Sequence, residues 1–395
     1  MDKLTRALQD DTDIQHVESS NEGFLLEADN NSSLQQLTQP VTQQLEKISV
    51  QSFTPIQLLG KGSFGEVYLV QKKQGLQYFA MKVLSKQRIM GQNLVRYAKT
   101  ERNVLSYTRH PFIVNLNYAF QSKDKLFLIL EYCPGGDLAR LLQKEKRFSE
   151  DRARLYAAQI LLAIQYLHRR DIIFRDLKPD NVVVDSQGHA LLTDFGLSKE
   201  GVLDNISAKS FCGSVAYLAP EMLKRSGHGK SVDWYLLGVL LYEMLVGQPP
   251  YFCNNKEQLF YNIQKGVLKL PASISNEAKS LLISLLNRNP NKRLGAGPTD
   301  AEEIKRHPFF DQVDWDKVLA KGYDMPKPPL RQINPQVIKS SIFEDPQESP
   351  HIQTIEASGE GTSMNASAMS HSNGGAGASN NIPGWSFVSP ADCQE

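Results

Sequence analysis

The stretch Phe174-Arg175-Asp176-Leu177-Lys178-Pro179-Asp180-Asn181 decides the fold of this 395-residue chain. It places a carboxylate, an ammonium group and a carboxamide at positions 176, 178 and 181. Asp176 can orient a hydroxyl group and accept its proton, and Lys178 can neutralise charge on a transferring phosphoryl group. Asn181 can bind a magnesium ion. Because these are the groups that phosphoryl transfer needs, the stretch predicts a catalytic loop.

Two short motifs follow this stretch in the chain. Asp194-Phe195-Gly196 supplies a second oxygen ligand for Mg²⁺, which as a hard cation prefers carboxylate oxygens bridged to phosphate. Ala219-Pro220-Glu221 then closes the segment. Each motif alone occurs by chance, but their order and spacing indicate one site.

A glycine-rich stretch, Gly60-Lys61-Gly62-Ser63-Phe64-Gly65, precedes these motifs. Glycine lacks a side chain, so backbone N–H groups can approach anionic oxygens closely. The pattern also occurs in ordinary turns and in dinucleotide-binding folds, where a helix follows directly. Here the residues from Glu66 to Val70 have the pattern of a strand, which favours the hairpin loop found over ATP.

Lys82 lies between apolar residues on the third predicted strand, and an inward lysine needs an anion. Glu101 follows on a predicted helix and could form the ion pair that holds Lys82 against the α- and β-phosphates. The alternative is an ordinary surface salt bridge, which would contribute under about 1 kcal/mol. The pair alone does not distinguish the two interpretations.

Organisation along the chain predicts an α+β protein with two lobes, because short strands come first and helices follow. The expected strands include 65–70, 78–84 and 126–130, and the expected helices are 95–109, 151–168, 232–246 and 277–287. We divide the chain into a disordered polar segment (1–52), a catalytic domain (53–310, with a small lobe at 53–130 and a large lobe at 134–310) and a C-terminal tail (311–395).

Composition excludes several classes of function. Lysine plus arginine (44) nearly balance aspartate plus glutamate (43), so we expect no nucleic-acid partner and no charge-driven membrane binding. The four cysteines lack metal-ligand spacing, which predicts free thiols in a reducing compartment. No apolar run is long enough to span a membrane. We therefore expect a monomer in the cytoplasm, with the nucleus as a second location and no integral membrane association.

Residues from about Phe53 to Phe310 resemble the eukaryotic protein kinases, and the details resemble the basophilic group that contains protein kinase B and the serum- and glucocorticoid-regulated kinases. The closer resemblance rests on three stretches: Lys209-Ser210-Phe211-Cys212-Gly213-Ser214, Lys292-Arg293-Leu294-Gly295 with His307-Pro308-Phe309-Phe310, and Ile382-Pro383-Gly384-Trp385-Ser386-Phe387. The resemblance implies a bilobal kinase fold, ATP and Mg²⁺ as cofactors, and serine/threonine specificity.

The resemblance also implies roles for further residues. Leu130 to Cys133 would form the hinge between the lobes, with backbone groups of Glu131 and Cys133 facing adenine. The other implied roles are as follows: Asp137 at the ribose; Val67 and Ala80 above the purine; Leu105, Leu116, Phe174 and Phe195 in a spine between the lobes; Arg293 paired with Glu221; Asp233 anchoring the catalytic loop; and Asp137, Asp180, Ser214 and Glu243 at a peptide site that reads arginines.

Two serines are predicted phosphorylation sites. A phosphate on Ser210 could bind Arg175 and Lys199 and order the segment after Asp194, although Ser210 could also be an ordinary loop serine. By the resemblance, the terminal residues 382–387 form a hydrophobic motif that folds back beside the Glu101 helix, and phosphorylation of Ser386 strengthens docking. The alternative is a disordered apolar C-terminus that does not dock. An upstream activating kinase is the implied partner.

The main rival hypothesis is a pseudokinase, a kinase-shaped scaffold or binding module without turnover. All of the catalytic residues Lys82, Glu101, Asp176, Lys178, Asn181 and Asp194 are present, which favours the enzyme. We therefore expect ATP- and magnesium-dependent phosphorylation of serine or threonine in arginine-rich protein substrates.

Overall fold

A computed structural model describes residues 48–62, 65–92, 94–202, 215–224, 226–331, 333 and 381–390. These residues all belong to one compact unit, 46–395. The predicted sites Ser63, Phe64, Ser210 and Ser214 lie outside the described residues, as do most of the 1–52 segment and most of the tail.

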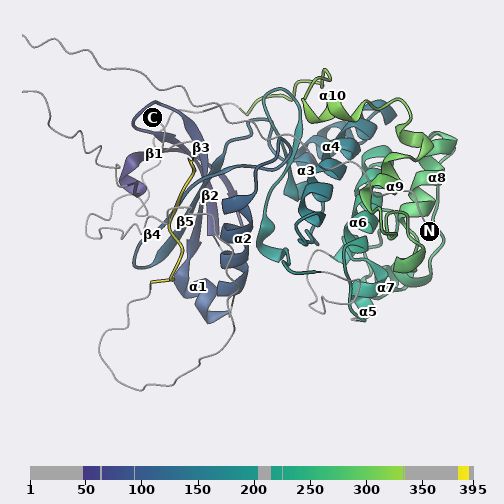
Figure 1. The fold of residues 1–395 in the computed structure, drawn as a ribbon, viewed down its shortest axis with the longest axis horizontal. Helices are drawn as coiled ribbons and strands as arrows, with labels where there is room; N and C mark the ends of the chain where they lie inside the picture. The colour runs from purple at the N-terminus through teal and green to yellow at the C-terminus, as the bar shows by residue number, and fades with distance from the viewer. Residues whose placement is uncertain are drawn as a thin grey trace, which may run out of the picture. The chain divides into compact units, whose positions relative to one another are not determined.

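The small lobe is built on a six-stranded antiparallel sheet in the order β1-β2-β3-β5-β4-β8 (Figure 1). Its strands are β1 (Phe53–Lys61), β2 (Gly65–Lys72), β3 (Tyr78–Ser85), β4 (Leu116–Gln121), β5 (Lys125–Glu131) and β8 (Phe387–Val388). Two helices, α1 (Lys86–Gly91) and α2 (Val95–Tyr107), connect β3 to β4. The sixth strand comes from the C-terminal tail, so strands from the two ends of the described chain form the opposite edges of one sheet.

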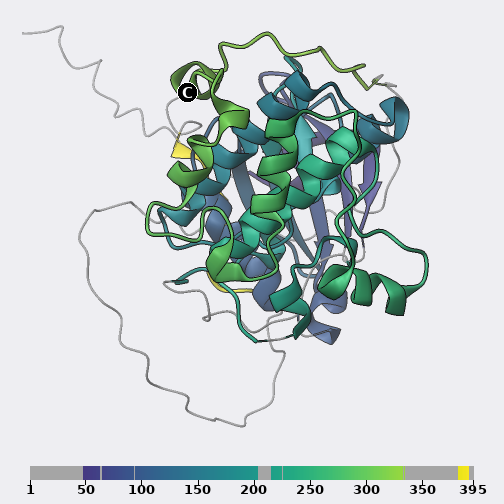
Figure 2. The same cartoon turned by 90° about the vertical axis from the view of Figure 1, so that its right-hand side faces the viewer.

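The large lobe is mainly helical, and Figure 2 views it from its helical side. Its helices are α3 (Leu138–Glu145), α4 (Glu150–His168), α5 (Pro220–Lys224), α6 (Ser231–Val246), α7 (Lys256–Lys265), α8 (Asn276–Leu285), α9 (Ala301–Lys305) and α10 (Trp315–Leu319). A two-stranded ribbon, β6 (Val182–Val184) with β7 (Ala190–Leu192), follows the catalytic loop.

Helices α4 and α6 form the centre of this lobe. Helix α4 begins where the Ser149 side chain accepts a hydrogen bond from the Arg152 amide, which satisfies one of the unpaired amides at a helix start. Helix α6 is buried around almost its whole circumference, as its apolar sequence requires. It ends at Gly247, whose φ of 95° is the left-handed conformation that glycine adopts most easily.

The predicted fold class is confirmed, because an antiparallel sheet forms one lobe and helices form the other. The strands and helices expected from the sequence are present, and each of their ends lies within two residues of the expected one. Structure also extends past both expected domain limits. Ile48 and Val50 are buried against Phe53 and the outer face of the sheet, and α10 packs its Trp315 ring on Phe310 at 5.4 Å.

No helix among the described residues is long and apolar enough to cross a bilayer. Both cysteines that the structure describes, Cys133 and Cys253, are free thiols, as expected. The other two cysteines lie outside the described residues.

Candidate active site

A lysine between two carboxylates connects the lobes at the site. The Nζ of Lys82 on β3 lies 2.6 Å from Oε1 and 2.8 Å from Oε2 of Glu101 on α2. It also lies 3.2 Å from Oδ1 of Asp194, which directly precedes the turn Phe195–Leu197. The sequence left open a surface salt bridge, but the Glu101 side chain is 4% exposed, so this ion pair is buried.

The two carboxylates keep Lys82 charged. Burial disfavours the ammonium form, but the charges of Asp194 and Glu101 outweigh it and raise the pKa of Lys82 above its usual range. The Lys82 charge in turn lowers the pKa of Asp194, against the effect of burial. Lys82 is therefore a cation and Asp194 an anion at neutral pH, which suits a site that handles phosphate.

The catalytic-loop side chains meet as their spacing predicts. Lys178 Nζ donates to Asp176 Oδ2 at 2.8 Å, and Asn181 Nδ2 donates to the same oxygen at 2.7 Å and to the Asp176 carbonyl at 2.8 Å. Burial raises the pKa of Asp176, and the bonds from Lys178 and Asn181 partly offset this effect. Asp176 is thus a carboxylate of increased basicity, held in one orientation by two donors.

The backbone of this loop is anchored from α6. Asp233 Oδ2 accepts from the Phe174 amide at 2.8 Å, and Oδ1 accepts from the Arg175 amide at 2.7 Å. Arg175 has a φ of 67°, a conformation that a non-glycine residue adopts only when its surroundings enforce it. Its guanidinium donates to the carbonyls of Leu197 and Ser198, so it ties the loop to the segment after Asp194.

The four residues assigned to a spine are all buried in one core cluster: Leu105, Leu116, Phe174 and Phe195. The Phe174 and Phe195 rings meet edge to face with centroids 5.1 Å apart. Val67 on β2 and Ala80 on β3 are both partly buried. Val67 lies opposite Lys82 on the neighbouring strand, two residues along from Ala80.

The glycine-rich loop and the hinge flank this arrangement. A Cβ atom on Gly65 would collide with the Val83 carbonyl, so this position requires glycine.

At the hinge, the Glu131 amide donates to the Asn115 carbonyl at 3.0 Å, and the Cys133 carbonyl accepts from the Gly136 amide at 3.2 Å. Glu131 is the last residue of β5, opposite Phe79 on β3, so the hinge begins directly at the end of this strand.

The tail crosses the hinge, a contact that the sequence did not predict. The Arg331 amide donates to the Pro134 carbonyl, and Arg331 Nη1 donates to the Leu59 carbonyl on β1, both at 3.0 Å. Pro328 packs so closely on Gly135 that a Cβ atom there would lie 2.6 Å away. The segment that follows α10 (Trp315–Leu319) in the chain therefore covers the hinge.

The acidic residues expected at a peptide site have different environments. Asp137 caps α3 by accepting from the Arg140 amide at 2.8 Å, so one of its oxygens is already engaged. Asp180 is exposed, and Glu243 accepts a hydrogen bond from the Tyr217 hydroxyl. Burial raises the pKa of Glu243, and the nearby Asp180 charge adds to this effect. The structure therefore groups Asp180 with Glu243 and adds Tyr217.

A buried ion pair holds the end of the segment before α6. Arg293 Nη1 lies 2.6 Å from Glu221 Oε1, and Nη2 lies 3.0 Å from Oε2, so the expected pair is present and its geometry is bidentate. Arg293 also donates to the Ser231 and Asn287 carbonyls. Because the Arg293 guanidinium is paired with the Glu221 carboxylate and with two carbonyls, the ion pair fixes α5 to the start of α6.

The donor set fits a hard divalent cation. The Asp194 side chain is half exposed, although the neighbouring Phe195 is fully buried. Asn181 uses its amide nitrogen on Asp176, which leaves its carbonyl oxygen as the acceptor that a cation needs. Among the described residues, no group of three or more His, Cys, Asp or Glu side chains is arranged to hold a metal ion by itself, so phosphate or water would complete the coordination.

The terminal motif docks on the small lobe. Trp385 is 1% exposed, and its Nε1 donates to the Phe120 carbonyl at 2.9 Å and the Phe127 carbonyl at 3.3 Å. Ile382 is also buried, and both its amide and its carbonyl bond to the Gln121 side chain at 2.9 Å. The sequence predicted that the tail docks. It did not predict that β8, in the yellow segment of Figure 1, pairs with β4.

Two arginines tie the docked tail to α2 and the loop after it. Arg102 follows Glu101 directly and donates to the Trp385 carbonyl at 3.1 Å and the Ser386 carbonyl at 2.7 Å. The guanidinium carbons of Arg102 and Arg109 lie 5.8 and 5.9 Å from the centre of the Phe387 ring. The tail therefore touches the helix that carries the catalytic glutamate.

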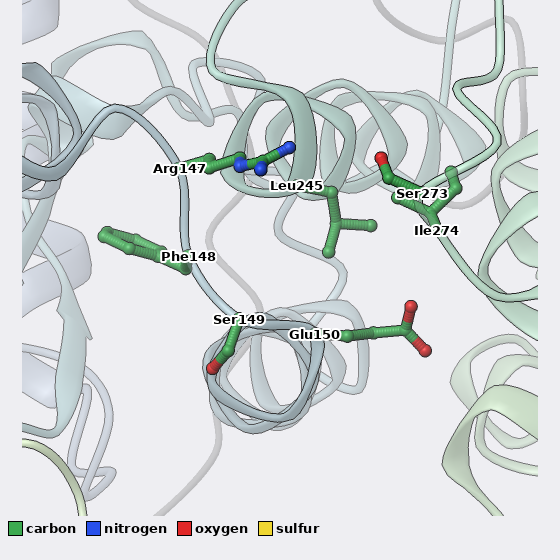
Figure 3. A pocket seen from close by; sticks show the side chains of 7 residues that line it. All are labelled: Arg147, Phe148, Ser149, Glu150, Leu245, Ser273 and Ile274. Atoms are coloured by element: carbon green, nitrogen blue, oxygen red, sulfur yellow. The ribbon is translucent and has the colours of Figure 1, made fainter.

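A separate pocket of about 300 Å³ lies at the start of α4, away from these residues (Figure 3). Its lining combines the loop before α4 with the end of α6 and the segment before α8: Arg147, Phe148, Ser149, Glu150, Leu245, Ser273 and Ile274. Its carboxylate, Glu150, is engaged with Arg154 and Ser275. The pocket contains none of the predicted site residues.

The fold and this site define a protein kinase. Residues 53–310 match the family described as the protein kinase domain, which are the limits expected for the catalytic domain. The chain belongs to this family.

Within the family, the chain is similar to RAC serine/threonine-protein kinases. It is 48% identical over 282 residues to the RAC family homolog of Dictyostelium discoideum, covering 71% of this chain and 63% of that protein. It is 42% identical over 314 residues to human RAC-beta, covering 80% and 65%. The chain thus spans less than two thirds of the length of these relatives. These similarities agree with the group resemblance found in the sequence.

Proposed function

We propose that this chain is a serine/threonine protein kinase that transfers the γ-phosphoryl group of ATP to a protein hydroxyl in intracellular signalling. The observation that carries the proposal is the joint arrangement of Lys82, Glu101 and Asp194 with Asp176, Lys178 and Asn181. Similarity to serine/threonine-protein kinases supports the choice of hydroxyl. A pseudokinase is disfavoured because no catalytic side chain is missing.

In the proposed reaction, the substrate oxygen forms a bond to the γ-phosphorus while the bond to the β–γ bridging oxygen breaks and ADP leaves. The substrate proton passes to Asp176, whose raised pKa suits a proton acceptor. Lys178, 2.8 Å from Asp176, places positive charge beside the transferring group. Lys82, held by Glu101, pairs with the α- and β-phosphates.

Asn181 and Asp194 would hold Mg²⁺, which when bound neutralises phosphate charge. The adenine would lie between Val67, Ala80 and the hinge groups of Glu131 and Cys133, and the remaining Asp137 oxygen would meet the ribose. The glycine-rich loop from Gly60 to Gly65 would cover the phosphates.

The test is transfer of labelled phosphate from ATP to an arginine-rich serine peptide. We expect transfer in the presence of Mg²⁺, loss of transfer with excess EDTA, and loss in Asp194→Ala. Absence of transfer from the unaltered, phosphorylated chain, with ATP binding retained, would instead support the pseudokinase.

We also propose that substrates carry arginines before the phosphorylated residue. The support is the group of carboxylates at Asp180 and Glu243, fixed on one side by Tyr217. Replacing the arginines of the peptide by alanine should raise KM in the parent. The same replacement should matter much less in Glu243→Gln, whose own KM for the arginine peptide is already raised.

Phosphorylation of Ser210 and Ser386 by an upstream kinase is proposed to activate the chain. Ser210 lies outside the described residues, and its support is the buried Arg175 beside Asp176. Ser386 is supported by its docked position, where its carbonyl already bonds Arg102 on α2. Ser210→Ala should lower kcat sharply, and unchanged turnover after phosphatase treatment would contradict the proposal.

We further propose a monomer that acts in the cytoplasm, with the nucleus as a second location. The support is the near-neutral charge and the free Cys133 and Cys253 thiols. Light scattering of the purified chain and microscopy of a tagged chain test the two statements.

A further inference from the structure

The histidine at the end of α4 is fully buried between two carboxylates from distant parts of the chain. His168 Nε2 lies 3.0 Å from Asp233 Oδ2, and His168 Nδ1 lies 3.0 Å from Asp300 Oδ2. The His168 and Asp233 side chains are 0% exposed, whereas Asp300, directly before α9, is 26% exposed. Trp234 meets the imidazole edge to face, with ring centres 4.8 Å apart.

This geometry determines the charge of the imidazole. A carboxylate only accepts hydrogen bonds, and a neutral imidazole has one N–H, so only the imidazolium can donate to both partners. Asp300 is held against His168 because its Oδ1 also accepts from Trp234 Nε1 at 2.6 Å. Both oxygens of Asp233 also accept hydrogen bonds, from the Phe174 and Arg175 amides, so this side chain acts as an acceptor toward each of its partners.

The directions of the pKa shifts in this group agree with the assignment. Burial alone would lower the pKa of His168, but its bonds to Asp233 and Asp300 outweigh burial and raise it. Burial likewise opposes the lowering of the Asp300 pKa, which the His168 charge and bond bring about. Among the described residues, Asp233 and Asp300 are the charged groups that face His168.

The same carboxylate that binds His168 holds the catalytic loop. Asp233 fixes the amides of Phe174 and Arg175, and Arg175 has the strained φ of 67° one residue before Asp176. When His168 loses its proton, one ring nitrogen faces a carboxylate without a hydrogen between them. The resulting repulsion acts on Asp233 and so on the anchor that keeps Arg175 strained.

We propose that His168 is a positioning residue for phosphoryl transfer, held as an imidazolium by Asp300 so that Asp233 keeps the catalytic loop in its active geometry. The effect of His168 on phosphoryl transfer rests on the proposed kinase activity. The protonation state of His168 is independent of that activity. The proposal assigns Asp300, whose carboxylate bonds His168 and Trp234, a role in sustaining the reaction at alkaline pH.

The protonation state is tested by nitrogen-15 NMR of the histidine side chains in the full chain, with His168→Gln used to assign the signal. We expect protons on both ring nitrogens at pH 7 and deprotonation only at higher pH. In Asp300→Asn the titration should move to lower pH. Glu302→Gln is the matched control, because Glu302 lies two residues further on and bonds Gln165 and Lys305.

The positioning role is tested by kcat and KM against pH. The parent should lose kcat at high pH with the same midpoint as the NMR titration. His168→Gln should lose about 10- to 100-fold in kcat at pH 7, the size of effect that a misplaced catalytic group produces. Its KM for ATP and peptide should be unchanged, and its alkaline decline should be absent.

The outcomes separate the two proposals. A single ring proton on His168 at pH 7, or an unchanged alkaline decline in His168→Gln, would overturn the positioning proposal. A merely structural role would reduce the amount of folded enzyme without changing the shape of the pH profile. A parent chain that transfers no phosphate would instead refute the kinase proposal, and the NMR result would remain interpretable.

Discussion

Replacing Trp385 by alanine should release the C-terminal tail from the small lobe. The side chain is 1% exposed and donates to the carbonyls of Phe120 and Phe127. Truncating a buried tryptophan costs about 3–5 kcal/mol, including the cavity that remains. At about 1.4 kcal/mol per tenfold change, docking should weaken by roughly 10²- to 4 × 10³-fold.

Hydrogen–deuterium exchange measures this release directly. The Ser389 amide bonds the Asn117 carbonyl at 2.7 Å in the docked tail, so residues 387–389 should be protected in the parent and exchange freely in Trp385→Ala. Trp385→Phe keeps most of the apolar area and loses the two hydrogen bonds, so it should be intermediate. Tyr261→Ala removes a 56% exposed aromatic side chain and should change nothing.

The same variant should reduce turnover. Arg102, next to Glu101 on α2, loses its carbonyl partners at Trp385 and Ser386 when the tail leaves. The kcat/KM for a peptide should therefore fall in Trp385→Ala and in a chain ending at residue 381. Full protection of residues 387–389 in Trp385→Ala would refute the docking energetics, and full activity despite lost protection would refute the link to catalysis.

Two further predictions concern the catalytic centre. Burial raises the pKa of Asp176, and Lys178 opposes this effect. Lys178→Met should therefore raise the pKa of Asp176 further and move the acid limb of the kcat/KM profile to higher pH. An acid limb that does not move would contradict the assignment of Asp176 as the proton acceptor. Gly65→Ala forces a collision with the Val83 carbonyl, so it should cost about 1–3 kcal/mol of stability and raise KM for ATP, measured by thermal unfolding and kinetics. Gly91→Ala, with nothing within 4 Å, is the control that should match the parent.

Much of the fold was predictable because its signals are local. The run of aromatic and other apolar residues in 78–84 and the longer apolar run in 232–246 each reveal an element within one stretch of sequence. The Lys82–Glu101 and Glu221–Arg293 pairs were predictable for a different reason, since motif order and the family resemblance named the partners. In both cases the information lay in residue type and spacing.

Other features depend on partners that the sequence does not identify. His168 looks like an ordinary histidine at a helix end, and its partners Asp233 and Asp300 come 65 and 132 residues later. Strand β8 has only two residues, too few for any periodicity, and its partner β4 lies far back in the chain. Such contacts are set by tertiary packing.

One contact at the site has a local signal in the sequence. Asp137 directly precedes the amphipathic helix α3, the position at which an aspartate side chain commonly caps a helix. That pattern predicts the bond from the Arg140 amide that the structure shows. Recognising it would have assigned one Asp137 oxygen to the helix before assigning the residue to a ligand.

The most direct test of the central claim is a single-turnover comparison of the parent with Asp176→Asn, using ATP, Mg²⁺ and an arginine-rich serine peptide, with mass spectrometry of the product. The account predicts one phosphate on the serine with the parent. It predicts a rate lower by about 10²- to 10⁴-fold in the variant, which keeps the size of the side chain but loses the proton acceptor. Equal rates in parent and variant, or no phosphopeptide from the parent, would contradict it.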